Sequence, residues 1–350
     1  MASKLYKIIF FILGIGTLAY MVYALGINEI WTNIQKTGWW FGPVLISWLI
    51  IYLMNAFAFR DIIYEKDKPE TKLPFGKVFQ LTVTGYAINY ITPFVALGGE
   101  PYRILELKSY MGSSKAGSSV LLYTMMHILS HLIFWVASVG LILWFVPTSH
   151  IVITACALII AMASILVWWF AKVYRKGITT TTLHTLSKLP LFGKKIANFA
   201  NKNSKSLHDI DHQVRSLYEN RRSKFYSSLI WEFFARVVGC AEIFFIARAL
   251  DLPMTYLESL IVSSGSSLFA NLIFFFPMQL GTREGGMAMA VASIGYEASI
   301  GVFIGIATRI RELVWIAIGL LLMVFSKRNK KNRKKQNINQ ETSSPLILNK

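Results

Sequence analysis

Two short stretches of the chain bring glutamate, arginine, glycine and proline together inside otherwise apolar sequence. The first, 92–103, reads TPFVALGGEPYR, and the second, 276–286, reads FPMQLGTREGG. An ionised side chain at membrane depth costs at least about 2.5–3.5 kcal/mol, so such residues are usually paired or face a polar cavity. The chemistry that they support is the binding and screening of a charged group. Glutamate suits a cation, and arginine suits an anion such as a phosphate.

The first stretch supplies four candidate substrate-binding residues and a candidate hinge. Its glutamate and arginine are three residues apart, so they can pair on one helical turn. A helix that begins at Pro101 would point its N-terminus, which favours an anion, at the same place. The glycines permit tight turns, and the earlier proline ends any helix before it. The candidates are therefore Gly98, Gly99, Glu100 and Arg103, with Pro93 as the hinge.

The second stretch supplies Arg283 and Glu284 as candidate substrate-binding residues. Because they are adjacent, their side chains point in different directions, and we expect each to have its own partner. Pro277 and Gly281 are candidate hinges, as is Pro93 in the first stretch. Either stretch by itself can be interpreted as an interfacial loop with snorkelling charges. Two matching copies favour a binding site.

Further polar residues interrupt the apolar segments. Glu232 and Arg236 are four residues apart, a spacing suited to an intrahelical pair, and together with Arg309 they complete the candidate substrate-binding residues. His127 and His131 have the same spacing, which can place two imidazoles on one metal ion, but the glutamate of a zinc-hydrolase motif is missing. The alternative for this pair is hydrogen-bonded histidines within a helix bundle. We predict no metal and no cofactor.

Motifs for catalysis or nucleotide binding are missing from the sequence. It contains no Walker loop, dinucleotide fingerprint or nucleophile elbow. Cys156 and Cys240 each lie inside an apolar segment, so they predict neither a disulfide framework nor a cysteine metal site. The sequence therefore favours a protein that is not an enzyme.

The elements that must position these residues are apolar segments separated by short polar stretches. Hydrophobic residues make up 54% of the 350 residues and charged residues only 15%, whereas a soluble chain usually carries about 25% charged residues. Because crossing a bilayer takes about 20 apolar residues, the pattern predicts an all-α, polytopic transmembrane helix bundle. The apolar segments are 8–25, 41–59, 78–97, 117–146, 151–171, 226–249, 257–277, 286–306 and 310–326.

The net charge of +18 is concentrated beside these segments. Twelve Lys/Arg residues face three Asp/Glu residues between Lys172 and Lys224, and Lys327–Lys335 holds seven Lys/Arg residues and no acid. Basic loops stay on the cytoplasmic side and are attracted to anionic lipids. We therefore expect a multi-pass protein of the inner (cytoplasmic) membrane with both termini in the cytoplasm. Its expected partners are membrane lipids, including anionic headgroups, and no nucleic acid.

Segment 78–97 differs from the others because several polar residues interrupt it before Pro93. A segment of this kind is a weak spanning helix but a reasonable re-entrant one, since broken backbone at membrane depth must be covered by protein or line a wet cavity. The sequence thus predicts about eight spans plus at least one re-entrant segment. The interrupting residues are Gln80, Thr82, Thr84, Asn89 and Thr92.

The two motifs predict an internal duplication in which 41–146 corresponds to 226–326. The copies would be inverted, as in many transporters. Strict inversion would make 257–277 re-entrant as well, leaving seven spans and a basic tail outside. The distribution of basic residues opposes that, so the prediction keeps eight spans.

The remaining segments complete a single transmembrane domain over 1–326. Loop 172–225 contains apolar residues at helical spacing and predicts an amphipathic helix on the cytoplasmic surface. Segment 327–350 is a tail, basic at first and then disordered. The apolar residues of the loop helix are Leu207, Ile210, Val214 and Leu217.

With these residues in view, the chain resembles the transmembrane domain of lysylphosphatidylglycerol synthases and the stand-alone proteins called flippase-like. The resemblance covers about 5–326 and is carried by the two motifs, by Trp231-Glu232 and by Arg309. Two departures are evident. Met278 and Gln279 stand where the family usually has glycines, and Tyr123-Thr124 lies where it often has an acidic–basic pair.

The resemblance implies a protein that moves a phospholipid or lipid-linked headgroup between leaflets. The aminoacyl-transfer domain of the synthases is not present in this sequence. Two alternatives remain at this point: an integral-membrane transferase acting on a lipid-linked substrate, and a membrane scaffold that recruits partners. The lipid itself and the oligomeric state are not predicted.

Overall fold

The computed structural model describes residues 16, 19–20, 23, 26–92, 98–147, 150–176, 187, 193–202, 204–272 and 282–343. Every regular element within these residues is a helix, as the all-α prediction expected. The predicted hinges Pro93, Pro277 and Gly281 lie outside the described residues.

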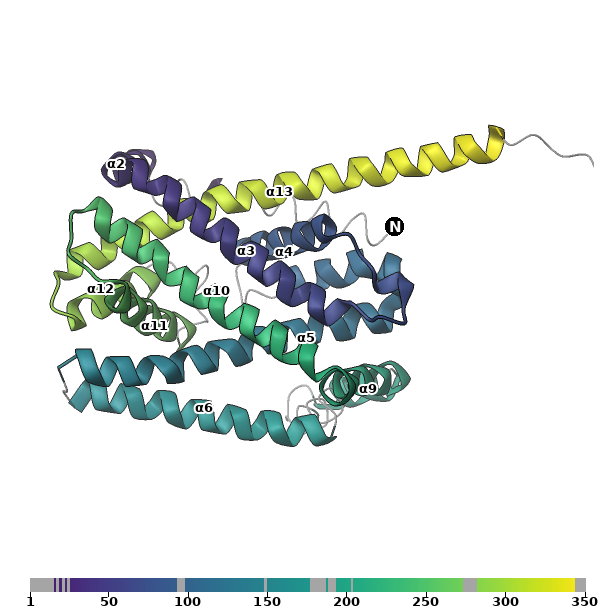
Figure 1. The fold of residues 1–350 in the computed structure, drawn as a ribbon, viewed down its shortest axis with the longest axis horizontal. Coiled ribbons are helices and arrows are strands. Elements are labelled where there is room, and N and C mark those ends of the chain that lie inside the picture. Colours follow the sequence, from purple (N-terminus) through teal and green to yellow (C-terminus); the bar gives the residue numbers. More distant parts are fainter. Residues whose placement is uncertain are drawn as a thin grey trace, which may run out of the picture.

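The first half of the chain forms helices that pack side by side with part of the second half (Figure 1). Its elements, in order, are α2 (Ile27–Thr37), η1 (Gly38–Trp40), α3 (Phe41–Ile63), η2 (Pro69–Thr71), α4 (Phe75–Ile91) and α5 (Gly99–Phe145).

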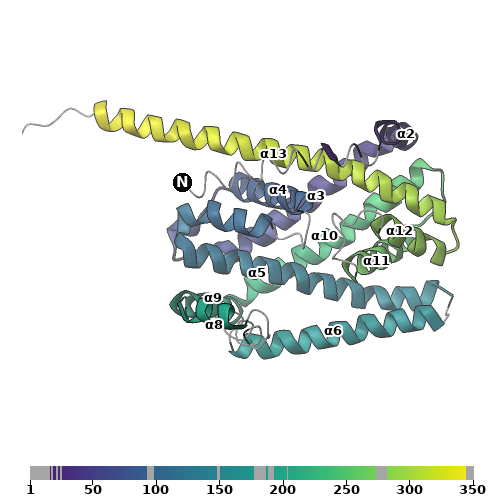
Figure 2. The same ribbon diagram turned by 180° about the vertical axis from the view of Figure 1, so that it is seen from behind.

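In the second half, α13 runs along one edge of the bundle and α6 along the opposite edge (Figures 1 and 2). The elements are α6 (His150–Lys176), α8 (Gly193–Lys202), α9 (Ser204–Asn220), α10 (Arg222–Ala249), α11 (Tyr256–Leu272), α12 (Thr282–Ser293) and α13 (Ala298–Ser343).

Helix α5 is interrupted at Gly112, where the chain folds back. The φ of Gly112 is +78° and its ψ is 171°, a conformation that glycine adopts without steric cost. Arg103, before the break, lies over the ring of Tyr123, after it. Helix α5 therefore consists of two helical arms, 99–111 and 113–145, which pack against each other.

The first arm of α5 also forms an antiparallel hairpin with α4. At one end Lys77 Nζ lies 3.1 Å from Glu106 Oε2, and at the other the Gly99 N–H donates to Asn89 Oδ1 at 2.7 Å. Between them, Gly85 lies against Gly99. The close approach of these two glycines allows the backbones of the hairpin to touch.

The second half contains a similar arrangement. Gly286 of α12 lies against the ring of Phe269 of α11, and Gly265 lies against Ala290, so α11 and α12 are antiparallel. The chain then turns at Gly295, whose φ is +91°, and enters α13, where Gly305 packs against Glu284.

This turn corrects one sequence prediction. Segment 286–306 was expected to be one span, separate from 310–326. The structure ends α12 at Ser293 and starts α13 at Ala298, which then continues through the second predicted segment. The predicted segment 286–306 ran through the turn, although Glu297, two residues after Gly295, is a polar signal for it.

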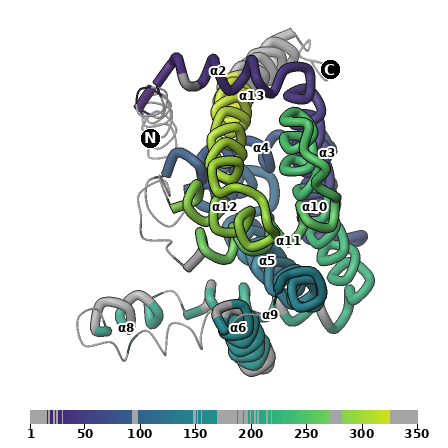
Figure 3. The backbone as a smooth tube through the Cα atoms, turned by 90° about the vertical axis from the view of Figure 1, so that its left-hand side faces the viewer, coloured from purple at the N-terminus to yellow at the C-terminus, as the bar shows by residue number. Residues whose placement is uncertain are grey.

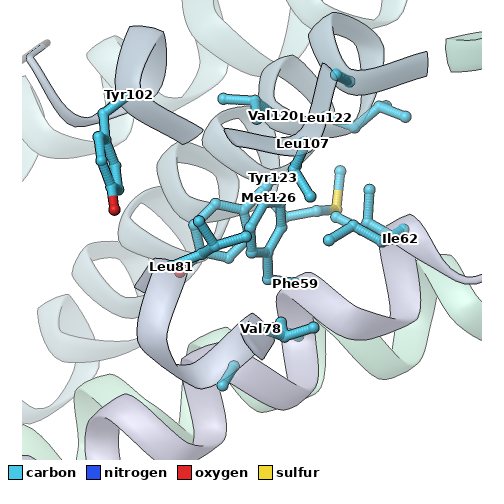
Figure 4. Packing of buried hydrophobic residues seen from close by; sticks show 14 of the residues in the cluster. Phe59, Ile62, Val78, Leu81, Tyr102, Leu107, Val120, Leu122, Tyr123 and Met126 are labelled. Atoms are coloured by element: carbon cyan, nitrogen blue, oxygen red, sulfur yellow. The ribbon is translucent and has the colours of Figure 1, made fainter. Parts of the chain in front are cut away.

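The largest apolar core lies where α3, α4 and both arms of α5 meet. Figure 4 shows Phe59 of α3, Leu81 of α4 and Tyr123 of α5 converging, and all three are buried. Leu217 of the predicted amphipathic helix belongs to the same core, and Ile210 packs on it. The helix α9 is therefore docked on the bundle through its apolar residues.

The connections gather at two ends of the bundle. The turns that join α10 to α11 and α12 to α13 lie at one end, together with α2, and the α3–α4 connection and α9 lie at the other (Figure 1). Figure 3, which views the bundle from one of its ends, places α8 to the side of α6. Among the described residues, two helical stretches, Ile30–Ile63 and Gly99–Phe145, are long and apolar enough to cross a membrane.

Candidate functional site

The first motif begins α5, and an asparagine of α4 holds its start. Asn89 accepts the Gly99 N–H through Oδ1 and donates through Nδ2 to Glu100 Oε1 at 3.3 Å. Gly98, the residue before the helix, is itself buried. The other carboxylate oxygen of Glu100, Oε2, is buried without a hydrogen-bond partner among the described residues. Asn89 thus fixes the glutamate while leaving one of its oxygens unused.

Arg103 is 1% exposed, yet its polar contacts are long. Its guanidinium lies 3.5 Å from Glu100 Oε1 and 3.4 Å from the carbonyl oxygens of Leu81 and Thr82. Protein hydrogen bonds to oxygen are usually 2.7–3.2 Å long.

Aromatic rings surround the same guanidinium. It lies 5.1 Å from the centre of the Tyr86 ring, 5.2 Å from Tyr123 and 5.8 Å from Phe59. These are cation–π distances. We call this group, made of Asn89, Glu100, Arg103, Tyr86 and Tyr123, the first-motif cluster.

The first-motif cluster continues into a histidine cluster, which contains His127, His131, Glu232 and Arg236. The Tyr86 hydroxyl lies 3.1 Å from both the Tyr123 hydroxyl and His127 Nδ1. That same imidazole nitrogen lies 2.8 Å from Glu232 Oε2. A single tyrosine therefore touches the arginine of the first motif with its ring and the histidine with its hydroxyl.

Arg236 holds the other side of the histidine cluster. It donates to Ser130 Oγ at 2.9 Å and to the His127 carbonyl at 2.6 Å, and it lies 2.6 Å from His131 Nε2. Because a guanidinium has only donors, His131 Nε2 accepts this bond. The predicted intrahelical pair of Glu232 and Arg236 is present at 3.7 Å.

The second motif begins α12, and both of its charges pair with α13. Arg283 contacts Glu312, and Glu284 Oε1 lies 2.8 Å from Arg309 Nε. Arg309 also lies 3.4 Å from Glu312 Oε2. The two adjacent motif residues thus have separate partners on one neighbouring helix.

One fully buried arginine ties α13 to α10. Arg311 lies 2.8 and 2.9 Å from the two oxygens of Glu242, in the bidentate arrangement. Its guanidinium stacks 3.5 Å from the Trp48 ring, whose N–H donates to Glu242 Oε2 at 2.8 Å. We call the group of Arg283, Glu284, Arg309, Arg311, Glu312 and Glu242 the second-motif cluster.

Aromatic side chains of α3 connect the two motif clusters. Trp48, which stacks on Arg311, packs on Tyr52 with ring centres 5.6 Å apart. Tyr52 packs on Tyr86 at 5.5 Å, and Tyr86 lies under Arg103. The charged groups therefore belong to one continuous polar and aromatic layer through the bundle.

The charges of this layer balance. It contains five arginines and five glutamates, so its net charge is zero when the histidines are neutral. Paired charges avoid most of the cost of an unpaired ion in a medium of low dielectric constant. The members are Arg103, Arg236, Arg283, Arg309, Arg311, Glu100, Glu232, Glu242, Glu284 and Glu312.

The sequence-predicted residues therefore fall into three adjoining clusters. Tyr86 and Trp48, which join them, were missed because an aromatic residue in an apolar segment gives no signal by itself. The available signal was the spacing of Tyr86, Asn89 and Tyr90, which follows one face of α4.

His127 and His131 also have the spacing of a metal-binding pair. Within the described residues, no group of three or more His, Cys, Asp or Glu side chains could hold a metal ion. The lone pair of His131 Nε2 is directed at Arg236, and a nearby cation disfavours a metal ion.

One family model matches the chain, and it covers residues 6–319. It is described as the lysylphosphatidylglycerol synthase TM region. No curated protein and no solved structure matches.

Proposed function

The chain belongs to the lysylphosphatidylglycerol synthase transmembrane family, and from this premise we propose that it moves a phospholipid or lipid-linked headgroup between the leaflets of the cytoplasmic membrane. Membership makes it a membrane protein of lipid metabolism or handling. The step from handling to translocation rests on the charged layer, since a headgroup that crosses a bilayer needs a polar route through it.

The observation that carries the proposal is the incomplete pairing of Arg103 beside the unused oxygen of Glu100. A headgroup phosphate can take the guanidinium without breaking any short hydrogen bond. An amine or hydroxyl of the same headgroup can donate to Glu100 Oε2, which is buried without a partner among the described residues. We therefore place the headgroup at the first-motif cluster.

The second-motif cluster has a different role in this proposal. Its ion-pair contacts of 2.8–2.9 Å are closer than those of the first-motif cluster, although Arg311 Nη1 is buried without a hydrogen-bond partner among the described residues. Arg283, Glu284 and Arg309 would hold α12 against α13 while the first-motif cluster exchanges its headgroup. These residues remain candidates for substrate contact only when the two helices separate.

The two hairpins favour an alternating route with six spans, of which 8–25 is taken from the sequence because it lies mostly outside the described residues. We assign α4 with the arm 99–111 to one re-entrant hairpin, and α11 with α12 to a second one on the opposite side. The spans are then 8–25, α3, the arm 113–145, α6, α10 and α13. This count replaces the predicted eight and keeps the basic tail 327–350 cytoplasmic, which removes the conflict between inverted repeats and the charge distribution.

The proposal is tested by reconstituting the protein into liposomes with a fluorescent phospholipid. The wild type is expected to accelerate leaflet exchange over empty liposomes, and Glu100→Gln is expected to slow it about tenfold or more. Arg283→Ala should slow it as well, by loosening α12.

Arg248→Gln is the matched control, because Arg248 is exposed near the end of α10 and lies outside the clusters. Equal exchange by the wild type, by both variants and by empty liposomes would defeat the proposal.

A further inference from the structure

The charged layer is neutral, so an anionic headgroup that enters it brings an uncompensated negative charge. A phosphodiester with an uncharged substituent carries one such charge. Moving an unpaired ion through a medium of low dielectric constant is costly. A group in the layer that accepted one proton would restore neutrality.

Three of the five glutamates are poor acceptors for that proton. Glu242, Glu284 and Glu312 each contact an arginine of the second-motif cluster, which does not lose its own proton, so protonating any of them would strand a buried charge. Glu100 is the acceptor for the headgroup in the proposed function, and a proton on its carboxylate would weaken that role. Glu232 also contacts an arginine, Arg236, at 3.7 Å, but its nearest partner is a histidine.

His127 and Glu232 behave differently. The imidazole Nδ1 lies 2.8 Å from Glu232 Oε2, so adding a proton to His127 turns a hydrogen bond into an ion pair. The side chain of His127 is 30% exposed, whereas that of Glu232 is 1% exposed. The imidazole is therefore the more accessible member of the pair.

His131 does not share this property. Its Nε2 accepts a hydrogen bond from Arg236 at 2.6 Å. A proton on that nitrogen would place two donors against each other, and it would do so beside a fixed positive charge. The proton acceptor is thus specific to one of the two histidines.

The groups around His127 couple its protonation to the headgroup site. Arg103 and Arg236 disfavour a positive imidazole, while Glu232 favours it. Tyr86 and Tyr123, with Asn55 donating to the Tyr86 hydroxyl at 3.1 Å, fill the space between His127 and Arg103. An anion held by Arg103 would offset the repulsion from that arginine.

We propose that the His127–Glu232 pair binds a proton together with an anionic phosphodiester headgroup at Arg103, so that the two cross the layer as a neutral unit. This rests on the proposed function, and it adds the coupling ion and the charge of the substrate. The step involves no covalent change: the proton comes from water on one side and returns to water on the other.

Proton uptake by the full-length protein in detergent tests this directly. A pH-indicator dye in weakly buffered solution reports uptake when short-chain phosphatidylglycerol is added. Between about pH 5 and pH 8, where histidine titrates, the wild type should take up as much as about one proton per bound lipid. The pH profile should be bell-shaped, because binding changes the protonation only between the pKa values of the free and the occupied site.

Three ligands separate the possible sources of the signal. Short-chain phosphatidylcholine, which has no net charge, should give no uptake. Glycerophosphoglycerol, which is the phosphatidylglycerol headgroup without acyl chains, should cause at most a small fraction of the proton uptake that phosphatidylglycerol causes. If glycerophosphoglycerol caused as much proton uptake as phosphatidylglycerol, the proposal that the ligand is a lipid would be wrong.

Two variants locate the proton. Uptake should be lost in His127→Gln and in Glu232→Gln, and it should be unchanged in His208→Gln, an exposed histidine of α9. If the wild type takes up no protons at any pH, the inference is wrong. This result does not depend on the variants, so their misfolding would not affect it.

The proton-uptake experiment and the leaflet-exchange assay can fail independently of each other. Leaflet exchange without proton uptake would retain the proposed function and reject this inference. Proton uptake without exchange would retain the coupled binding site and reject translocation.

Discussion

The two motif clusters contain similar residues but hold them in different ways. In the second, Arg309 and Arg311 lie 2.8 Å from their glutamates, and Arg311 is bidentate. In the first, the shortest contact of Arg103 to an oxygen is 3.4 Å, and most of its surroundings are aromatic rings. Both arginines 103 and 311 are nearly inaccessible, so burial does not explain the difference.

The difference shows how one motif can serve two purposes. Short bidentate ion pairs fix two helices together and are strongly disrupted by the loss of either partner. A guanidinium held mainly by rings keeps its charge and its donors for a ligand. The first-motif cluster thus has the properties of a binding site, and the second those of a structural joint.

The largest expected effect comes from breaking the joint. Arg311→Met leaves Glu242 buried without its bidentate partner and should lower the free energy of unfolding by about 3–5 kcal/mol. The double variant Arg311→Met with Glu242→Leu should recover most of the loss, because it leaves no buried charge from this pair. Thermal unfolding in detergent measures the stability of both variants. Equal destabilisation of the single and the double variant would contradict the structural role of the Arg311–Glu242 pair.

A smaller effect is expected where the first hairpin depends on close backbone contact. A Cβ at Gly99 would lie 2.9 Å from Asn89 Oδ1 and against the Gly85 backbone, so Gly99→Ala should cost about 1–3 kcal/mol. Gly140→Ala is the control, since a Cβ there meets nothing within 4 Å. Equal unfolding temperatures for the two variants would show that the helices of the hairpin are not in contact.

The smallest effect comes from an ion pair outside the charged layer. Burial alone would raise the pKa of Glu65, but hydrogen bonds from Lys115 and Lys68 lower it below its usual value. A lowered pKa contributes stability that is present above the unfolded value and is lost as the pH falls through the folded value.

The wild type should therefore lose more stability than Glu65→Gln below about pH 4.3, the ordinary pKa of a glutamate. Unfolding temperatures of both proteins across that range test the expectation. If the unfolding temperatures of the two proteins fall in parallel as the pH is lowered, Glu65 does not contribute to the loss of stability in acid.

Much of the candidate site could be predicted from the sequence, because ionised residues stand out in apolar segments. Glu100 with Arg103, and Glu232 with Arg236, were paired correctly from their helical spacing. The partners of Arg283 and Glu284 could not be predicted, because they depend on how α12 folds against α13. The identification of the family was confirmed over 6–319.

The helix boundaries were predicted less well where glycine reverses the chain. Gly112 and Gly295 both adopt a positive φ. The arm 99–111 before Gly112 lies between the predicted segments 78–97 and 117–146, and the turn at Gly295 lies inside the predicted segment 286–306. The spacing of Tyr86 and Asn89 places them on one face of α4, but the contacts of Tyr86 with Tyr52, and of Tyr52 with Trp48, depend on how α3 packs in the bundle.

The measurement that tests the central claim most directly is crosslinking from a lipid with a photoreactive headgroup, followed by peptide mapping. The reconstituted protein is irradiated, and the modified residues are identified by mass spectrometry. The first-motif cluster, as the headgroup site, predicts adducts within α4 and the start of α5, around Tyr86 to Arg103, which Arg103→Gln should reduce. Adducts confined to α12 and α13, or equal labelling in Arg103→Gln, would contradict the account.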